Sequence, residues 1–322
     1  MYSIISAFLF ALVALSSVAA QAQGYPDRSI RIIVPFATGG FADIAGRRIG
    51  QALSESLGVP VIVDNKAGAG GQIGADAAAK ATPDGYTLLL GSNGPLTIGP
   101  ALYATVPYNP IKDFEPIILL GESPIALLVN PSLPIANLRE LVVYLKANPG
   151  KVSVASPGVG TSSHLAGELF QIVTGSKMLH VPYKGSGPVM TDLVGGQVNS
   201  AFDPLSSSLT FVKAGKIRAL AVTGDRRAPT LPDVPTMSEA GVTGYDASTF
   251  VALLAPAGTP QAVIAKLNAA ANKALESAAV KDSFAQFATV TLGGTPDRLA
   301  DYVKSDLAKW TRVVREANVK PE

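Results

Sequence analysis

Two short loops rich in small residues carry the strongest pattern for ligand chemistry. "IVPFATGGFADIAGR" (33–47) runs from an apolar strand through a proline and a Gly-Gly pair into a helical pattern, and "VSVASPGVGTSSHLAGELF" (152–170) repeats this order. Each loop would present backbone N–H groups at a helix start, where a positive potential of about half a unit charge favours a carboxylate or phosphate oxygen. Helix capping alone explains one such loop. Two in matching positions predict a clamp for a ligand with an anionic group at each end.

The candidate ligand-binding side chains lie in these loops or at a neighbouring strand end. Asp43, Thr161 and Ser162 could instead serve as helix caps. His164, on the first turn after the second loop, is expected either to contact the ligand or to brace the loop, and His180 is expected to be structural. The predicted ligand-binding residues are Phe36, Thr38, Gly40, Phe41, Asp43, Ser156, Gly160, Thr161, Ser162, His164 and Asp203.

Two charged residues near the second loop have open roles. Asp203 ends the strand "VNSAFD" before Pro204, and it is expected either to reach the ligand or to cap the next helix. Lys184 lies in the strand-to-helix loop "HVPYKGSGP", which topology places on the same edge of the sheet. Its ammonium group would either reinforce anion binding or stand in solvent, as most lysines do.

Catalytic, metal and nucleotide sites find little support in the sequence. Ser162 and Ser163 adjoin His164 but point elsewhere on the same helical turn, and no G-x-S-x-G motif is present. The two histidines have no nearby carboxylate cluster, so we expect no metal site. The glycines of "NKAGAGGQIGAD" (65–76) lack the G-x-G-x-x-G spacing. We interpret that segment as a tight turn with close helix–strand packing and expect no cofactor.

Composition places the chain among folded proteins of two lobes. It has 322 residues, 48% of them apolar and 16% charged, which supplies enough apolar material for sizeable cores. The net charge of +2 is spread along the chain without a basic run, so we expect no nucleic-acid partner. Because there are no cysteines, neither disulfides nor a lipid anchor on cysteine can form.

The first 22 residues read as a secretory signal peptide. An apolar run from Ile4 to about Val18 precedes Ala20-Gln21-Ala22, a small-x-small cleavage site. The run is shorter than the ~20 residues that a membrane span needs, although the start lacks a basic residue. We predict cleavage after Ala22 and export to the periplasm.

The rest of the chain alternates strand-like and helix-like segments, which predicts an α/β fold with parallel-rich sheets. One series runs from "SIRIIVPF" to "GYTLLLG", and a second follows "FEPIILLGESPIALLVNP". Two C-terminal helices are expected, at 261–277 and 298–317. We predict a discontinuous lobe 1 (23–123 plus 248–322) and a lobe 2 (124–247), joined by two hinge strands.

The motifs also resemble a known family, the periplasmic receptors of tripartite tricarboxylate transporters, also called Bug proteins. The resemblance spans essentially the whole mature chain and implies a type II periplasmic-binding-protein fold that closes around a small carboxylate. At Phe41 many relatives carry a small or hydroxyl residue, so this ring would either form an apolar pocket wall for a dicarboxylate or aromatic carboxylate, or pack in the core. The motifs that carry the resemblance include "YPDRSIRIIVPFATGGFADIAGR", "ATPDGYTLLLG", "GTSSHLAGELF", "HVPYKGSGPVMTDLVGGQV" and "APAGTP". The family's binding pattern would fall on Phe36, Gly39, Gly40, Asp43, Gly160, Thr161, Ser162, His164 and Asp203.

The resemblance implies a monomeric receptor that delivers its carboxylate to large and small membrane subunits of a transporter. A receptor that signals to a sensor protein would use the same closed form, so that alternative stays open. A periplasmic hydrolase of carboxylic acids is the third alternative, and it lacks a nucleophile–base pair at plausible spacing.

Overall fold

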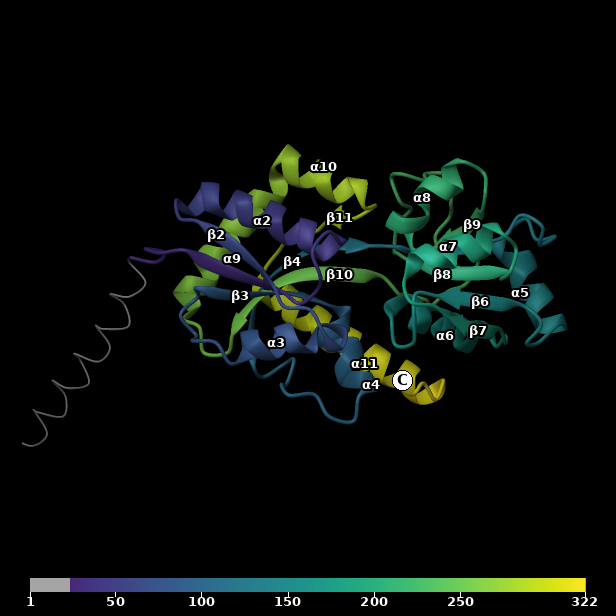
Figure 1. Cartoon of the computed structure of the whole chain (residues 1–322), viewed down its shortest axis with the longest axis horizontal. Coiled ribbons are helices and arrows are strands. Elements are labelled where there is room, and N and C mark those ends of the chain that lie inside the picture. Colours follow the sequence, from purple (N-terminus) through teal and green to yellow (C-terminus); the bar gives the residue numbers. More distant parts are fainter. Residues whose placement is uncertain (1–23, 322) are drawn as a thin grey trace, which may run out of the picture.

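Two α/β lobes lie side by side along the long axis of the molecule, each built around one sheet (Figure 1). The computed structural model describes residues 24–321, so the predicted signal peptide lies outside the described residues. Within residues 24–321, no helix combines the length and the apolar character that crossing a bilayer requires. The bilobal α/β fold predicted from the sequence is confirmed.

The first lobe contains a six-stranded sheet in the order β11-β4-β10-β3-β1-β2. Its strands are β1 (Ile30–Val34), β2 (Val61–Asn65), β3 (Thr87–Ser92), β4 (Phe114–Ser123), β10 (Thr249–Pro256) and β11 (Val290–Thr291). Its helices are α2 (Phe41–Leu57), η1 (Ala69–Gly71), α3 (Gln72–Ala79), η2 (Gly94–Ile98), α4 (Gly99–Leu102), α9 (Gln261–Glu276), α10 (Ala278–Gln286) and α11 (Pro296–Glu316).

The second lobe contains a five-stranded sheet in the order β7-β6-β8-β5-β9. Its strands are β5 (Ile125–Val129), β6 (Ser153–Ser156), β7 (Leu179–Pro182), β8 (Ser200–Pro204) and β9 (Arg218–Val222). Its helices are α5 (Leu138–Ala147), α6 (Ser162–Thr174), α7 (Ser186–Val194) and α8 (Leu205–Lys213).

Both sheets are mixed. The strand–helix–strand units supply the expected parallel pairs, β1 with β2 and β3, and β6 with β7 and β8. The antiparallel pairs are β10 with β3 and β4 and β5 with β8 and β9, from the strands beside the lobe junction, and β11 with β4. The sheets therefore contain fewer parallel pairs than the alternation of elements alone suggests, because the connecting strands reverse direction.

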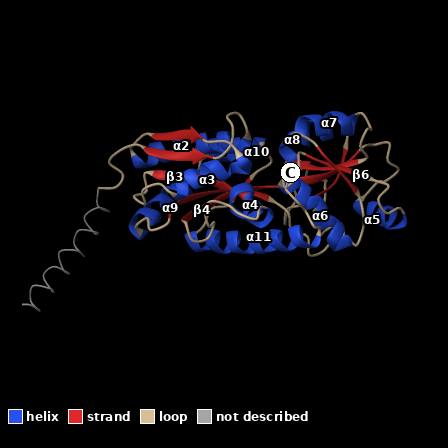
Figure 2. Cartoon of the chain, turned by 60° about the horizontal axis from the view of Figure 1, so that its bottom comes forward, coloured by secondary structure: helices blue, strands red, loops and turns tan. Residues whose placement is uncertain are grey.

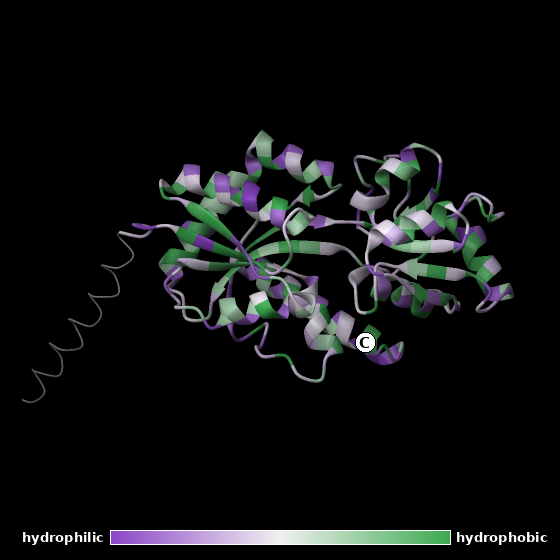
Figure 3. Ribbon diagram, in the orientation of Figure 1, coloured by the Kyte–Doolittle hydropathy of each residue, from purple (hydrophilic) through white to green (hydrophobic). Residues whose placement is uncertain are grey.

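Apolar strands in both lobes are buried between helices, and hydrophilic residues gather on the outer faces (Figure 3). The five residues of β5 are all buried, which explains its continuous apolar sequence. Close packing also fixes single positions. A Cβ at Gly46 on α2 would lie 2.8 Å from the Val34 side chain, so this glycine lets the helix pack directly on β1.

Three connections join the lobes. The chain passes from β4 to β5 through Pro124, and it returns to the first sheet at β10. The two crossing segments are tied together, because the Thr249 hydroxyl donates to the Ser123 carbonyl over 3.0 Å. Helix α11 runs beneath both lobes (Figure 2). This arrangement supports our proposed division at 123/124 and 247/248, with α11 belonging to both lobes.

Packing along α11 explains why this helix belongs to both lobes. Leu299 and Val303 are buried against the first sheet, while Trp310 and Val313 are buried in the core of the second lobe. The only tryptophan of the chain thus anchors the end of a helix that began in the other lobe.

Two helical regions differ from the expectation. Between the two predicted C-terminal helices lies α10, which begins directly after α9 because the Ser277 hydroxyl accepts a hydrogen bond from the Val280 N–H and caps a new helix. The segment 94–102 is helical although it carries Pro95 and Pro100. Each proline sits in the first turn of its helix, where the missing N–H has no partner to lose.

Candidate functional site

The two predicted loops line one cleft between the lobes. The cleft has a volume of about 410 Å³, and residues from the starts of α2 and α6 face it together with residues after β3 and at the start of β10. Its lining consists of Phe36, Gly40, Phe41, Ala42, Gly70, Ser92, Asn93, Gly94, Ile98, Gly160, Thr161, Ser162, Thr249, Phe250 and Val251.

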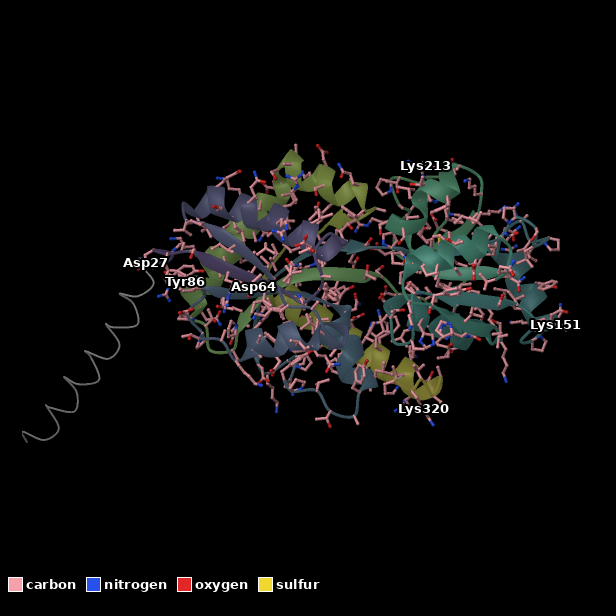
Figure 4. All side chains as sticks on the ribbon, in the orientation of Figure 1. Asp27, Asp64, Tyr86, Lys151, Lys213 and Lys320 are labelled. Carbon is pink, nitrogen blue, oxygen red and sulfur yellow. The ribbon has the colours of Figure 1, made fainter. Side chains whose placement is uncertain are left out.

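The cleft lining contains no charged side chain. Of the charged residues labelled in Figure 4, Asp27 and Lys151 lie at opposite ends of the molecule, and Lys213 lies at the edge of the second lobe. Lys184 is exposed and does not line the cleft. Attraction for an anion must therefore come from backbone N–H groups, hydroxyls and helix dipoles. Five of the lining residues, Phe36, Phe41, Ile98, Phe250 and Val251, add apolar walls.

The first loop leaves its helix start open. Gly40 precedes α2, and no described side chain caps this end, so the first N–H groups of α2 remain for a ligand or water. Gly39 turns the chain with φ of 87°, a conformation that glycine adopts without strain. The Asn65 amide donates to the Phe36 carbonyl over 3.0 Å and ties the loop to β2.

Asp43 holds the first loop in shape and lies outside the cleft lining, so the structure places it behind the loop and not among the residues that face the cleft. Its Oδ2 accepts a hydrogen bond from the Gly39 N–H over 3.0 Å, and its Oδ1 lies 2.9 Å from the Arg47 guanidinium. Burial would raise the pKa of Asp43, but the bonds from Arg47 and Gly39 outweigh it and lower the pKa. The carboxylate stays charged and braces the loop from behind. Thr38 is exposed and also lies outside the cleft lining.

The second loop is capped by its own side chains. The Thr161 hydroxyl accepts from the His164 N–H over 3.2 Å and donates to the Gly158 carbonyl over 2.8 Å. Its single proton is therefore used within the loop, and Thr161 caps α6 while its other atoms face the cleft. The neighbouring Ser162 lines the cleft, and its hydroxyl makes no hydrogen bond to another described residue, so it can donate to a ligand there.

His164 braces the second loop, which is one of the two roles expected for it. The ring is 6% exposed, and its Nδ1 accepts a hydrogen bond from the Gly160 N–H over 3.1 Å. Because Nδ1 is an acceptor, the neutral ring carries its proton on Nε2, 3.6 Å from a Glu168 carboxylate oxygen. Ser156 is 1% exposed and bonds the His180 ring over 2.7 Å. Neither His164 nor Ser156 lines the cleft, and both lie where they support the loop.

Asp203 is wholly buried at the end of β8 and does not line the cleft. Among the described residues, neither carboxylate oxygen has a hydrogen-bond partner. Burial raises the pKa of this carboxyl to about 7, an effect that the nearby Ser186 and Ser207 hydroxyls partly offset. The structure therefore places Asp203 inside the second lobe and not among the residues that face the cleft.

Phe41 combines the two roles predicted as alternatives. As the first residue of α2 it lines the cleft. Its ring also packs against Phe284 of α10 and against Phe287, which directly follows that helix, with ring centroids 5.8 and 5.3 Å apart. The cleft wall at this point is therefore an extension of the core.

Sequence reasoning missed the cleft residues that come from elsewhere in the fold. Asn93 and Gly94 follow β3, at the same sheet edge as the first loop, and their "SNGP" turn was a usable signal. Gly70 comes from the segment interpreted as a packing turn. Close packing holds for its neighbour Gly74, where a Cβ would meet Pro35 and the Lys66 carbonyl at 2.8 Å, but Gly70 itself faces the cleft.

Two α/β lobes with a ligand-sized cleft between them, lined by helix starts from both, define a periplasmic solute-binding protein. The chain belongs to the tripartite tricarboxylate transporter family of receptors, whose family pattern matches residues 45–319. It is 41% identical over 311 residues to protein BugT of Bordetella pertussis, covering 96% of this chain and 95% of BugT.

Solved structures with the same fold include two with carboxylates bound. R. palustris Rpa4515 with adipate matches with a TM-score of 0.79 and 35% identity, covering 92% of this chain and 100% of that one. MatC (Rpa3494) from Rhodopseudomonas palustris with bound malate matches with a TM-score of 0.74 and 34% identity, covering 90% and 100%.

Proposed function

We propose that this chain is a periplasmic receptor that captures a small carboxylate between the starts of α2 and α6. The cleft itself carries the proposal, because helix N-termini from both lobes converge on a lining without a charged side chain. Each N-terminus offers N–H donors and about half a positive charge, which suits one carboxylate group. The structures of relatives with adipate and malate support this ligand class.

The apolar walls indicate what lies between the anionic groups. Phe36 and Phe41 stand at the first loop, and Ile98 and Phe250 come from the other side of the lining. A ligand with a hydrocarbon or aromatic body would bury its carbon atoms there, at about 25 cal/mol for each Å² removed from water. We therefore propose a dicarboxylate or an aromatic carboxylate, with no catalytic step.

The receptor would hand its ligand to the large and small membrane subunits of a tripartite tricarboxylate-type transporter. Closure of the lobes around the ligand would present a surface that those subunits recognise. Co-purification of the ligand-loaded chain with the large and small membrane subunits of such a transporter would support this role. Binding to a sensor protein and not to those subunits would favour signalling.

A thermal-shift panel tests the ligand class. Adipate, malate and benzoate should raise the melting temperature in proportion to the logarithm of their concentration above Kd. Adipamide has the chain length of adipate without its charge, so it serves as the matched control and should have no effect. Stabilisation by adipamide or by neutral sugars, with none by the acids, would contradict the proposal.

A further inference from the structure

A buried carboxylate lies behind the part of the cleft lining formed by Asn93 and Phe250, which we call the cleft floor. Asp306 of α11 is 3% exposed, and its Oδ2 accepts three hydrogen bonds. The donors are Asn93 Nδ2 at 3.0 Å, Thr97 Oγ1 at 2.7 Å and Trp310 Nε1 at 3.0 Å. The other oxygen, Oδ1, lies 2.8 Å from Lys309 Nζ. A carboxylate with this many donors is held in one position, because moving it would leave buried groups unpaired.

Asn93 connects this carboxylate to the cleft. Its side chain is 3% exposed, and the residue belongs to the cleft lining. Its Oδ1 accepts a hydrogen bond from the Phe250 N–H over 2.8 Å, and its Nδ2 lies 3.4 Å from the Ser248 carbonyl. Both backbone groups stand where the chain re-enters the first sheet at β10.

The carboxylate decides which way the Asn93 amide points. An ionised carboxylate only accepts hydrogen bonds, so it must face the NH₂ group of Asn93 and not its oxygen. The amide oxygen is then directed at the Phe250 N–H. Without Asp306 the amide could turn over, and the Phe250 N–H would lose its acceptor.

Asp306 also occupies the middle of α11, a helix that packs in both lobes. Leu299 and Val303 pack in the first lobe, and Trp310 packs in the second. Lys309 extends the network, since its ammonium lies 3.0 Å from Asp246 on the segment that leads into β10. Burial alone would lower the pKa of Lys309, but the Asp306 and Asp246 carboxylates raise it above its ordinary value, so the ion pair stays charged.

We propose that Asp306 is a positioning residue for ligand binding, which acts through Asn93 to hold the cleft floor against β10 and α11. It does not line the cleft. Its removal should nevertheless weaken binding, because the floor, the crossing strand and the shared helix are set by one carboxylate. The part of this inference that concerns affinity rests on the proposed carboxylate-binding function.

Hydrogen exchange tests the positioning without any ligand. Asp306→Asn removes the charge and offers a single acceptor oxygen, and it should speed amide exchange at Phe250 and in 93–98 while the strands of the second sheet keep their protection. Asp301→Asn, at an exposed carboxylate on the same helix, is the matched control. If Asp306→Asn does not fold, Asp306→Glu displaces the carboxylate but keeps its charge, and the same local effect is expected. Unchanged exchange at Phe250, or a uniform loss across both lobes, would overturn the positioning role.

Affinity supplies the second readout, with the acid that most stabilises the wild-type chain as probe. Asp306→Asn should raise its Kd by about tenfold, and Asp301→Asn should leave it unchanged. If Asp306 acts through Asn93, the double variant Asn93→Ala/Asp306→Asn should bind no more weakly than Asn93→Ala alone. Additive losses would overturn the inference. If no acid binds the wild-type chain, the proposed function fails, whereas the exchange experiment still decides the role of Asp306.

Discussion

His164 and His180 lie face to face behind the second loop, with ring centroids 3.9 Å apart and planes inclined by 8°. The stack joins α6 to β7, and each ring makes a bond that fixes the loop. His164 accepts from the Gly160 N–H, and His180 bonds the Ser156 hydroxyl. The shape of the second loop therefore depends on two imidazoles that lie outside the cleft lining.

Acid should destabilise the fold through this stack. Burial, and then the neighbouring His164, lower the pKa of His180 to about 4, whereas the unfolded chain has the ordinary value of 6.5. The unfolded state therefore binds the proton more readily, and stability falls as the pH drops from 6.5 toward 4. His180→Gln retains a partner for Ser156 but cannot titrate. Between pH 8 and pH 5 the free energy of unfolding should fall by about 1 kcal/mol less in this variant than in wild type. The difference is expected to be this small because the His180 ring is only partly buried. If urea titration gives the same loss of unfolding free energy for His180→Gln and for wild type, His180 is not the group responsible for the acid sensitivity.

Asp203 should give the opposite pH dependence. Its folded pKa of about 7 exceeds the ordinary 3.8, so the folded state favours the protonated form, and ionisation costs stability as the pH rises through that window. Asp203→Asn should raise the free energy of unfolding at pH 8 by about 2 kcal/mol, with the gain disappearing near pH 4. Asp233→Asn, at an exposed carboxylate of the same lobe, should change neither value. A gain that is the same at both pH values would point to packing and not to charge.

Two adjacent residues of the second loop should separate binding from stability. Ser162→Ala removes the free hydroxyl at the cleft and should weaken binding of the probe acid by about 1–3 kcal/mol while the ligand-free melting temperature stays unchanged. Thr161→Ala removes the cap of α6 and should lower stability by about 1 kcal/mol, and Thr161→Ser should restore it. Calorimetric titration measures the affinity of each variant, and thermal melts of the same samples measure its stability. Unchanged affinity in Ser162→Ala would assign the contact to backbone amides or water.

Phe41 should tune ligand choice as well as stability. Phe41→Ser takes away one apolar wall and the contacts with Phe284 and Phe287. We expect a loss of about 1–3 kcal/mol in stability, because the ring is only partly buried. Binding of benzoate or adipate should weaken more than binding of malate, whose carbon body is smaller. A uniform change in Kd for all three acids would show that Phe41 serves the core alone.

Much of this site can be predicted from local sequence. Strand, glycine turn and helix start occur twice in the same order, and such a turn needs residues like Gly39 that adopt positive φ. The apolar strands and the helix periodicity likewise follow from neighbours a few positions apart. Local pattern therefore predicts two α/β series and two anion-binding helix starts.

Local sequence pattern does not predict the direction in which each polar side chain of the loops points. Thr161 and Ser162 are adjacent and chemically alike. The Thr161 hydroxyl nevertheless caps the helix, whereas the Ser162 hydroxyl faces the cleft without a partner among the described residues. Asp43 and His164 sit in equivalent places after the two loops, and both turn back to hold glycine N–H groups. Such choices depend on which donors the rest of the fold leaves unpaired.

The order of motifs along this chain predicts the fold, the family and the two loops of the proposed clamp, since each depends on residues close in sequence. The floor of the cleft depends on contacts of Asn93 with Phe250 and Asp306. Phe250 follows Asn93 by 157 positions along the chain, and Asp306 follows it by 213. No local pattern encodes such a meeting. It arises because β10 returns to the first sheet and α11 crosses beneath both lobes, so the tertiary structure alone decides which polar groups pair behind the ligand.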